Sequence, residues 1–200
     1  MKYLSRITVD HLTAARQRLN DSYAWHKALW RAFPEIESRK FLYRIETSEA
    51  AFRVYLLSEQ EPKAPDWGRW ETKPVSDGFL KHPRFRFRLC ANPTRRYLQD
   101  GRGIRFEKGK RFVVADPDAL KKWLSRKGEL GGFAVEEQTL QISPPISQPF
   151  YKDGRKGNHK RVEFSGVLNV TDTAKFTETF NHGIGSAKAF GFGLLVLQPV

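Results

Sequence analysis

The sequence predicts an α+β protein built from two tandem βαββαβ units, each of the ferredoxin-like (RRM-like) class. The first observation behind this prediction is that apolar residues alternate in some short segments and follow a helical period in others, in the order β, α, β, β, α, β, twice over. The second is the break at Asn92-Pro93, which divides the 200 residues into two parts of ordinary domain size. The third is the composition: with 40% hydrophobic and 13% aromatic residues, the chain can build a core in each part.

The first unit, predicted over residues 1–91, contains four strands and one clear helix. Alternation of Tyr3, Ile7 and Val9 with polar residues predicts the first strand, and Asn20, Asp21 and Ser22 offer N-caps for a helix that ends before Pro34. A loop rich in proline and glycine precedes the last strand, Phe85-Arg-Phe-Arg-Leu89, which alternates strictly. The predicted strands span residues 3–9, 40–46, 51–58 and 85–89, and the helix spans residues 22–33.

The second unit, predicted over residues 92–200, repeats the pattern. Asp116-Pro117 supplies an N-cap followed by proline at the first helical position, and Asp172-Thr173 caps another helix. The glycine- and lysine-rich segment 152–158 is typical of a hairpin tip. The predicted strands and extended segments span 105–115, 133–146, 161–170 and 191–197, and the helices span 119–127 and 172–181.

The positive charge of the chain is concentrated in two segments. Lys and Arg number 35 against 22 Asp and Glu, a net charge of +13. Residues 81–111 hold eleven basic and two acidic residues, a net +9, and residues 152–161 hold five basic and one acidic residue, a net +4. The rest of the chain is neutral. A single run of this kind is commonly a solvated face, but two runs that hold the whole excess favour a phosphate-binding surface, most simply for nucleic acid.

Several classes of protein are excluded by composition. The single cysteine, Cys90, permits neither an internal disulfide nor a multi-cysteine zinc site. The N-terminal segment has charges at Lys2, Arg6 and Asp10 where a signal peptide would be apolar, and no run of 18 apolar residues could span a membrane. We therefore expect a cytoplasmic protein that does not act at a membrane.

His26 is the foremost candidate for chemistry. On the predicted helix, Trp25, Ala28, Leu29, Ala32 and Phe33 form the core stripe, whereas Tyr23, His26 and Trp30 group away from it. A lone histidine is more often structural, but this one lies off the core stripe beside a phenol and an indole. His159 on the basic hairpin ranks second; His11 and His82 are expected at the surface, and His182 precedes a glycine-rich segment.

A histidine beside a basic surface suits RNA cleavage. RNA carries its own nucleophile, the 2′-hydroxyl, and an imidazole can act as acid or base near neutral pH. The sequence has neither a His/Cys cluster nor a dense set of carboxylates, so we expect no metal and no cofactor.

The segment from Gly183 to Gly193 is the second informative stretch. It is neither a dinucleotide-binding fingerprint nor a P-loop. Gly183, Gly185, Gly191 and Gly193 with Lys188 between them would allow a close backbone approach to an anion, and the alternative is that these glycines make room for chain packing.

Five segments carry a resemblance to a known family. The pattern Gly183-Ile-Gly185, five residues, Gly191-Phe-Gly193 resembles the C-terminal signature of CRISPR repeat-processing endoribonucleases of the RAMP class. Residues 1–6, 23–34, 87–93 and 164–168 are similar to the CasE (Cse3) family of the type I-E Cascade complex.

The resemblance implies a function and its residues. It implies tandem ferredoxin-like domains, cleavage of CRISPR repeat RNA at the base of its stem-loop without a metal, and products with a 5′-hydroxyl and a 2′,3′-cyclic or 3′ phosphate. It further implies a monomer when alone that stays bound to the crRNA and joins other type I-E Cascade subunits. His26 and Tyr23 match the family's catalytic histidine and tyrosine. Lys160, Arg161 and Arg155 are candidates for the cation of the transition state, and we choose Lys160.

The predicted RNA-binding residues come from the two basic segments and the glycine-rich stretch. They are Arg95, Arg96, Arg102, Arg105, Lys108, Lys110, Arg111, Lys152, Arg155, Lys156, His159, Arg161, Gly183, Gly185, Lys188, Gly191 and Gly193. The alternative to an enzyme is a non-catalytic hairpin-RNA-binding scaffold in which His26 is only a contact. A double-stranded DNA binder is disfavoured, because no predicted helix is dense in Arg, Asn or Gln.

Overall fold

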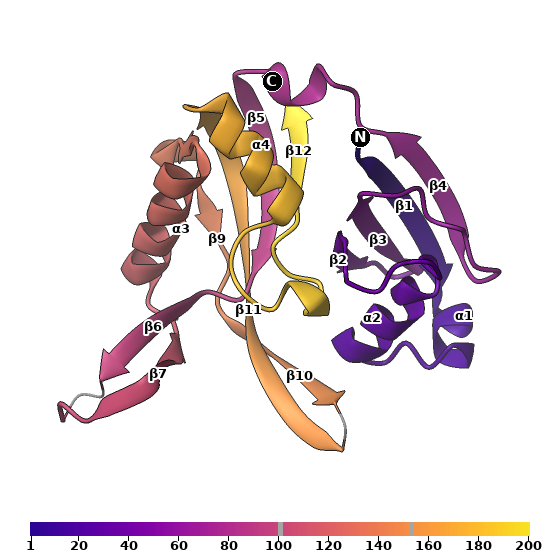
Figure 1. Cartoon of the computed structure of the whole chain (residues 1–200), viewed down its shortest axis with the longest axis horizontal. Coiled ribbons are helices and arrows are strands. Elements are labelled where there is room, and N and C mark those ends of the chain that lie inside the picture. The colour runs from indigo at the N-terminus through magenta and orange to yellow at the C-terminus, as the bar shows by residue number, and fades with distance from the viewer. Residues whose placement is uncertain (100–101, 153) are drawn as a thin grey trace.

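The computed structural model describes residues 1–99, 102–152 and 154–200, and shows a four-stranded and a six-stranded sheet side by side, each with helices packed on it (Figure 1). The predicted α+β class is confirmed. In both sheets the strand order is that of the ferredoxin-like fold: in each unit the fourth strand pairs with the first, the first with the third, and the third with the second.

The first sheet has the order β2-β3-β1-β4 with antiparallel pairing throughout. Its inner face packs Ile7, Val9, Val54 and Leu56 against the apolar stripe of helix α2, all of which is buried as predicted. The elements are β1 (Tyr3–Asp10), α1 (His11–Arg16), α2 (Ser22–Trp30), β2 (Phe41–Thr47), β3 (Ala51–Ser58) and β4 (Arg69–Pro74).

The second sheet has the order β10-β11-β5-β12, and the short strands β8 and β9 also pair with β11. Phe85, Phe87 and Leu89 of β5 face the two helices of this unit in a core with Phe164 and Phe176. The elements are β5 (Arg84–Ala91), α3 (Pro117–Gly131), β8 (Phe133–Val135), β9 (Gln141–Ile142), β10 (Ile146–Lys152), β11 (Arg155–Val170), α4 (Thr173–His182) and β12 (Leu195–Pro199); 3₁₀ turns lie at Phe79–Lys81, Glu137–Thr139 and Lys188–Phe190 (η3).

A two-stranded ribbon, β6 (Thr94–Gln99) with β7 (Arg105–Val113), projects away from the second sheet beside helix α3 (Figure 1). The predicted hairpin β10–β11 projects on the same side of the molecule, and Lys152 pairs with Arg155 at its outer end (Figure 1). Most basic residues of the two charged segments therefore lie on these two hairpins. Their side chains are exposed to solvent because the strands extend beyond the sheet.

Two predictions about the division of the chain are wrong. Strand β5 is the first strand of the second sheet, paired with β11 and β12, and not the last strand of the first unit. The fourth strand of the first sheet is β4, in a segment that was predicted to be a loop. The two sheets therefore separate between residues 75 and 83 instead of at Asn92-Pro93, and the strand expected at 105–115 is half of the ribbon.

The two units are in direct contact. Leu42 and Leu57 of the first sheet belong to the hydrophobic core of the second unit. The Tyr43 hydroxyl of β2 donates to the backbone carbonyl oxygens of Ser22 and of Ala189, each at 2.9 Å. These contacts hold the N-terminus of α2 next to the glycine-rich loop of the second unit.

Candidate active site and nucleic-acid interface

His26 lies on α2 in a half-buried aromatic environment. The centres of the Tyr23, Trp30 and Phe41 rings lie 6.3, 5.5 and 6.1 Å from the centre of the imidazole. The helical spacing of Tyr23, His26 and Trp30 places all three on one side, as predicted. The Nδ1 atom of His26 is buried and has no hydrogen-bond partner among the described residues.

The electrostatic surroundings of His26 favour the neutral imidazole. Burial lowers the pKa of His26, and the positive charges of Arg39 and Lys152 lower it further. Arg39 precedes β2 and its guanidinium carbon lies 6.0 Å from the centre of the Phe41 ring. A neutral imidazole can accept a proton at neutral pH, so the arrangement suits a general base.

The hairpin β10–β11 approaches the N-terminus of α2. The backbone N–H of Tyr151 donates a 2.9 Å hydrogen bond to Oδ2 of Asp21, the N-cap residue of α2. Lys160, on the same hairpin, donates from Nζ to Ser147 Oγ at 2.7 Å and from its backbone N–H to Asn92 Oδ1 at 3.0 Å. The structure therefore brings Tyr23 and His26 together and holds the hairpin that carries Lys160 against their helix.

His159, the second-ranked histidine, is packed into the protein. Its ring stacks on Phe150 at 4.6 Å and lies 4.8 Å from Phe190 and 5.6 Å from Phe192. Burial lowers its pKa, and its Nε2 atom is buried without a partner among the described residues. The ring faces the aromatic cluster and not the solvent side of the hairpin, which sequence alone could not distinguish.

The glycines of the C-terminal stretch mostly contact the protein itself. A Cβ on Gly183 would come within 2.8 Å of the Gly193 carbonyl oxygen, and a Cβ on Gly193 would come within 2.6 Å of the Ile184 carbonyl oxygen. Gly191 packs beside the ring of Tyr43. Gly183, Gly191 and Gly193 therefore make room for close packing of the chain, whereas Gly185 lies at the edge of a groove.

That groove, of about 740 Å³, lies between the ribbon β6–β7 and helix α3. The residues that line it include six basic side chains and no acidic one. Half of the basic side chains were predicted and come from the ribbon: Arg95, Arg96 and Arg111. The other half, Lys122, Arg126 and Lys127 of α3, were missed; their spacing on the exposed face of a predicted helix was the signal that could have found them.

Lys188 lies between the groove and the His26 site. It is half-buried in η3, and burial together with the positive charges of Arg39 and Lys127 lowers its pKa. Arg39 also acts on His26, and Lys127 lines the groove. Arg39 thus acts on both His26 and Lys188, and Lys127 acts on Lys188 from the wall of the groove.

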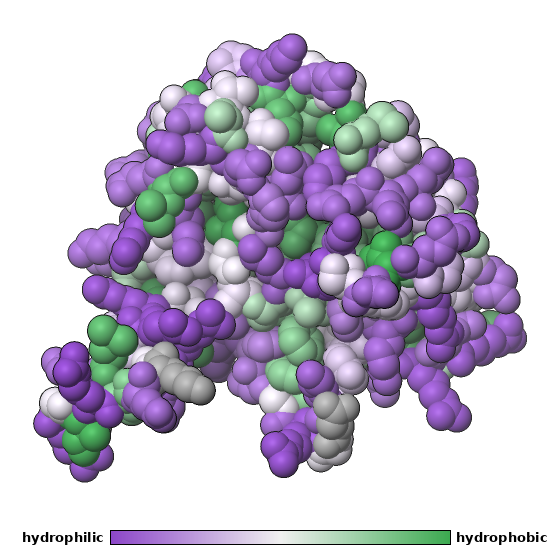
Figure 2. Space-filling model, viewed as in Figure 1, coloured by the Kyte–Doolittle hydropathy of each residue, from purple (hydrophilic) through white to green (hydrophobic). Residues whose placement is uncertain are grey.

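The other predicted RNA-binding residues lie on the two hairpins. Arg105 and Lys110 are exposed on the ribbon, and Figure 2 shows hydrophobic side chains interspersed there among hydrophilic ones. Lys152, Arg155 and Lys156 are exposed near the tip of β10–β11, with Arg102 exposed in the loop of the ribbon. Arg161 is instead committed to an ion pair with Glu163 at 2.6 Å, and the side chain of Lys108 lies outside the described residues.

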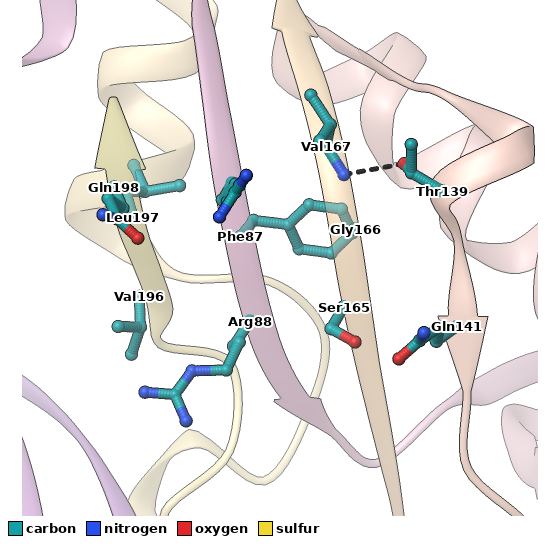
Figure 3. A pocket seen from close by; sticks show the side chains of 11 residues that line it. Phe87, Arg88, Thr139, Gln141, Ser165, Gly166, Val167, Val196, Leu197 and Gln198 are labelled. Atoms are coloured by element: carbon teal, nitrogen blue, oxygen red, sulfur yellow. Dashed lines mark hydrogen bonds between the residues drawn. The ribbon is translucent and has the colours of Figure 1, made fainter. Parts of the chain in front are cut away.

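A second cavity of about 510 Å³ opens on the face of the second sheet that the helices do not cover (Figure 3). Arg86, Arg88, Ser165 and Gln198 line it, and Arg88 forms an ion pair with Glu46 at 2.9 Å. None of the predicted site residues lines this cavity.

The remaining histidines are exposed. His11 contacts the carbonyl oxygens of Ser48 and Glu49 at 3.1 Å, and His182 lies 3.0 Å from Glu178. Within residues 1–99, 102–152 and 154–200, no group of three or more His, Cys, Asp or Glu side chains could hold a metal ion. Nor is any helix in that part of the chain long and apolar enough to cross a membrane.

The comparison with known proteins covers almost the whole chain. Residues 2–199 match the protein family described as "CRISPR associated protein". The chain is 31% identical to the CRISPR system Cascade subunit CasE of Escherichia coli (strain K12), covering 99% of this chain and all of CasE. It is 31% identical to the CRISPR-associated endoribonuclease Cse3 of Thermus thermophilus, covering 93% of this chain and 94% of Cse3.

Among solved structures, the fold matches that of Thermus thermophilus Cse3 bound to an RNA representing a pre-cleavage complex. The TM-score is 0.83 at 27% identity, covering 99% of each chain. Sequence and fold thus agree over nearly the full length of these relatives. The chain therefore belongs to the CasE (Cse3) family of CRISPR associated proteins.

Proposed function

We propose that this protein is an endoribonuclease that binds the stem-loop of CRISPR repeat RNA and cleaves pre-crRNA at the base of the stem. The observation that carries this proposal is the half-buried His26, whose pKa is lowered, on a helix that contacts the second unit, where a basic groove has no acidic lining residue. The names of its relatives, an endoribonuclease and a Cascade subunit, support the same function.

In the proposed reaction, His26 accepts the proton of the 2′-hydroxyl next to the scissile phosphate. The 2′-oxygen attacks phosphorus, and the bond to the 5′-oxygen breaks. The products are a 2′,3′-cyclic phosphate and a 5′-hydroxyl, whose oxygen takes up a proton from water. Addition of a water molecule to the cyclic phosphate then gives the 3′ phosphate. Tyr23, beside the imidazole, orients the reacting group, and Lys160 on the hairpin stabilises the negative charge that develops on the phosphate. No step of this scheme uses a metal ion, so we expect EDTA to leave the rate unchanged.

The RNA stem would occupy the groove between the ribbon and α3. Arginine and lysine side chains on both walls neutralise phosphates of the two strands, which positions the duplex without reading its sequence. With the stem held there, the base of the stem would lie toward Lys188 and His26. After cleavage we expect the protein to stay on the crRNA as a subunit of Cascade, in the cytoplasm.

Two RNAs test the reaction. One is an all-ribose repeat RNA, and the other has a single 2′-deoxy nucleotide at the cleavage position. We expect cleavage of the first and none of the second, because the deoxy nucleotide removes the nucleophile. Failure to cut either RNA would favour the alternative of a non-catalytic hairpin-binding scaffold.

The variant His26→Ala tests the assignment of the base. We expect its cleavage rate to fall at least about 10²-fold, while the affinity for the stem-loop stays within several-fold. His11→Ala is the matched control, because His11 is exposed and bonded only to backbone carbonyls. Full activity of His26→Ala in EDTA would contradict the proposed mechanism.

A further inference from the structure

We propose that Asp21 is a positioning residue for the cleavage reaction: its carboxylate joins the N-terminus of α2 to the outer half of the hairpin β10–β11 and so fixes the basic residues there, Lys152 and Arg155, relative to His26. This inference rests on the proposed function. Asp21 itself contacts neither reacting group; it acts through the two elements that carry them.

Asp21 uses its two carboxylate oxygens for two different elements. Oδ1 accepts the backbone N–H groups of Tyr23 and Ala24, at 2.9 and 2.7 Å, and so caps α2. Oδ2 accepts the backbone N–H of Tyr151 at 2.9 Å, across 130 residues of sequence. An N-cap needs only one oxygen, so the second bond is additional to the local structure of the helix.

The bond to Tyr151 fixes the half of the hairpin that is farthest from its sheet. Closer to the sheet, Asn92 holds Lys160 through its backbone N–H, and Ser147 lies opposite Lys160 in the register. Tyr151 lies four residues farther along β10, beyond the last of these contacts. Without the bond to Asp21, the described polar contacts would hold the hairpin only at its base.

Aromatic packing fills the space between helix and hairpin but does not define their register. Phe190 lies 6.3 Å from Tyr23 and 4.4 Å from Phe150, measured between ring centres. Such contacts are non-directional and tolerate sliding, whereas a charge-assisted hydrogen bond has a preferred length and direction. Loss of the Asp21 bond should therefore loosen the hairpin without detaching it.

The variant Asp21→Asn separates the two roles of the carboxylate. Asparagine caps helices as well as aspartate does, but its amide NH₂ cannot accept the Tyr151 N–H. We expect the single-turnover cleavage rate to fall about tenfold or more, because misplacement by about 1 Å can cost up to 10²-fold. The Kd for the stem-loop should stay within about threefold of wild type, since phosphate contacts in the groove dominate binding.

Asp10→Asn is the matched control. Asp10 caps α1 by accepting the backbone N–H and the hydroxyl of Thr13, at 2.8 and 2.7 Å, and both bonds are local. The variant should cleave at the wild-type rate. We therefore expect a lower cleavage rate at unchanged Kd in Asp21→Asn and no change of either quantity in Asp10→Asn. Weakened folding alone would lower the rate and the affinity together.

The bond can also be removed from the other side. Tyr151→Pro lacks the N–H and Tyr151→Ala keeps it, so the comparison of the two isolates the donor. Proline is tolerated in β10, an edge strand that already contains Pro149. We expect Tyr151→Pro to cleave at least about tenfold more slowly than Tyr151→Ala. The double variant Asp21→Asn, Tyr151→Pro should cleave no more slowly than Tyr151→Pro alone, because both changes remove the same bond.

The outcomes distinguish this inference from the proposed function. A wild-type protein that cleaves, with Asp21→Asn and Tyr151→Pro each within twofold of their controls, would overturn the role of Asp21 and leave the proposed function standing. A wild-type protein that does not cleave the repeat RNA would overturn the proposed function and this inference with it.

Discussion

The guanidinium of Arg44 on β2 forms an ion pair with the carboxylate of Glu163 on β11 at 2.8 Å, and so connects the two sheets. The Arg44 side chain is only 6% exposed, and it also pairs with Glu46 at 3.0 Å. Burial raises the pKa of Glu163, but the positive charges of Arg44 and Arg161 lower it more, so the net effect is a pKa below its ordinary value of 4.5. This pair lies near the junction on which the candidate site is built.

We expect Glu163→Gln to lower the free energy of unfolding by about 1–3 kcal/mol at pH 7, because Arg44 and Arg161 lose a charged partner in a poorly solvated place. The pKa of Glu163 is lower in the folded state than in the unfolded state. Its contribution is therefore present above pH 4.5 and is lost as the pH falls through the folded pKa. Urea denaturation of both proteins at pH 7 and in acid measures the difference.

The control for that variant is Glu71→Gln. Glu71 is about as exposed as Glu163 and also pairs with two arginines, but the side chains of Arg6 and Arg69 are 55% and 80% exposed, so solvent screens these pairs. It should change stability much less. An equal loss in both variants, or a difference that persists in acid, would contradict the linkage argument.

The pH dependence of cleavage should report the environment of His26. If the neutral imidazole is the base, the single-turnover rate rises with pH, and the midpoint of the rise lies below the ordinary histidine value of 6.5, because burial, Arg39 and Lys152 lower the pKa. Lys152→Gln removes one of these positive charges, so the pKa of His26 rises and the midpoint moves to higher pH. Lys156→Gln, on the same hairpin, is the control and should leave the midpoint in place.

Salt dependence of binding tests the groove. With Arg95 and Arg96 both replaced by glutamine, the slope of log K against log salt should become less steep by roughly 0.9 for each lost phosphate contact. The control is Arg53→Gln with Arg69→Gln, which makes the same change in net charge at exposed positions of the first sheet. Identical slopes for the two double variants would mean that total charge and not the groove drives binding.

We expect two glycines with the same φ to differ in how much stability is lost when each is replaced by alanine. Gly183 and Gly154 both have a φ of +73°, but a Cβ at Gly183 would meet Gly193 and Leu42, whereas nothing lies within 4 Å at Gly154. Replacing Gly154 by alanine should cost about 1–2 kcal/mol from the backbone alone. Gly183→Ala should cost about 1–3 kcal/mol more, from overpacking and because the ψ of Gly183, 167°, lies outside the left-handed helical region that alanine can enter.

Thermal or urea unfolding measures both variants. Equal losses would show that the loop yields to the added methyl group, and the close packing of Gly183 would then have no energetic weight.

The sequence by itself determined the α+β class, the two basic segments, one of them as a hairpin, and the position of His26. Periodicity shows which residues of a strand or helix face a core, so the apolar stripe of α2 left Tyr23 and His26 outside it. Charge counting located the basic residues of the ribbon. Strand β4 was missed because Arg69-Trp-Glu-Thr-Lys-Pro74 is a polar edge strand that ends in proline and has little alternation to detect.

The tertiary structure alone decided which elements become neighbours. Alternation in Phe85–Leu89 is the same whether the strand closes the first sheet or opens the second, because side-chain burial does not identify the hydrogen-bonded partner. Three features depend on residues far apart in the chain. They are the packing of His159 among aromatic rings, the position of the basic residues of α3 opposite the ribbon, and the bond between Asp21 and Tyr151. Such contacts are fixed by packing among whole elements, and no local pattern in the sequence encodes them.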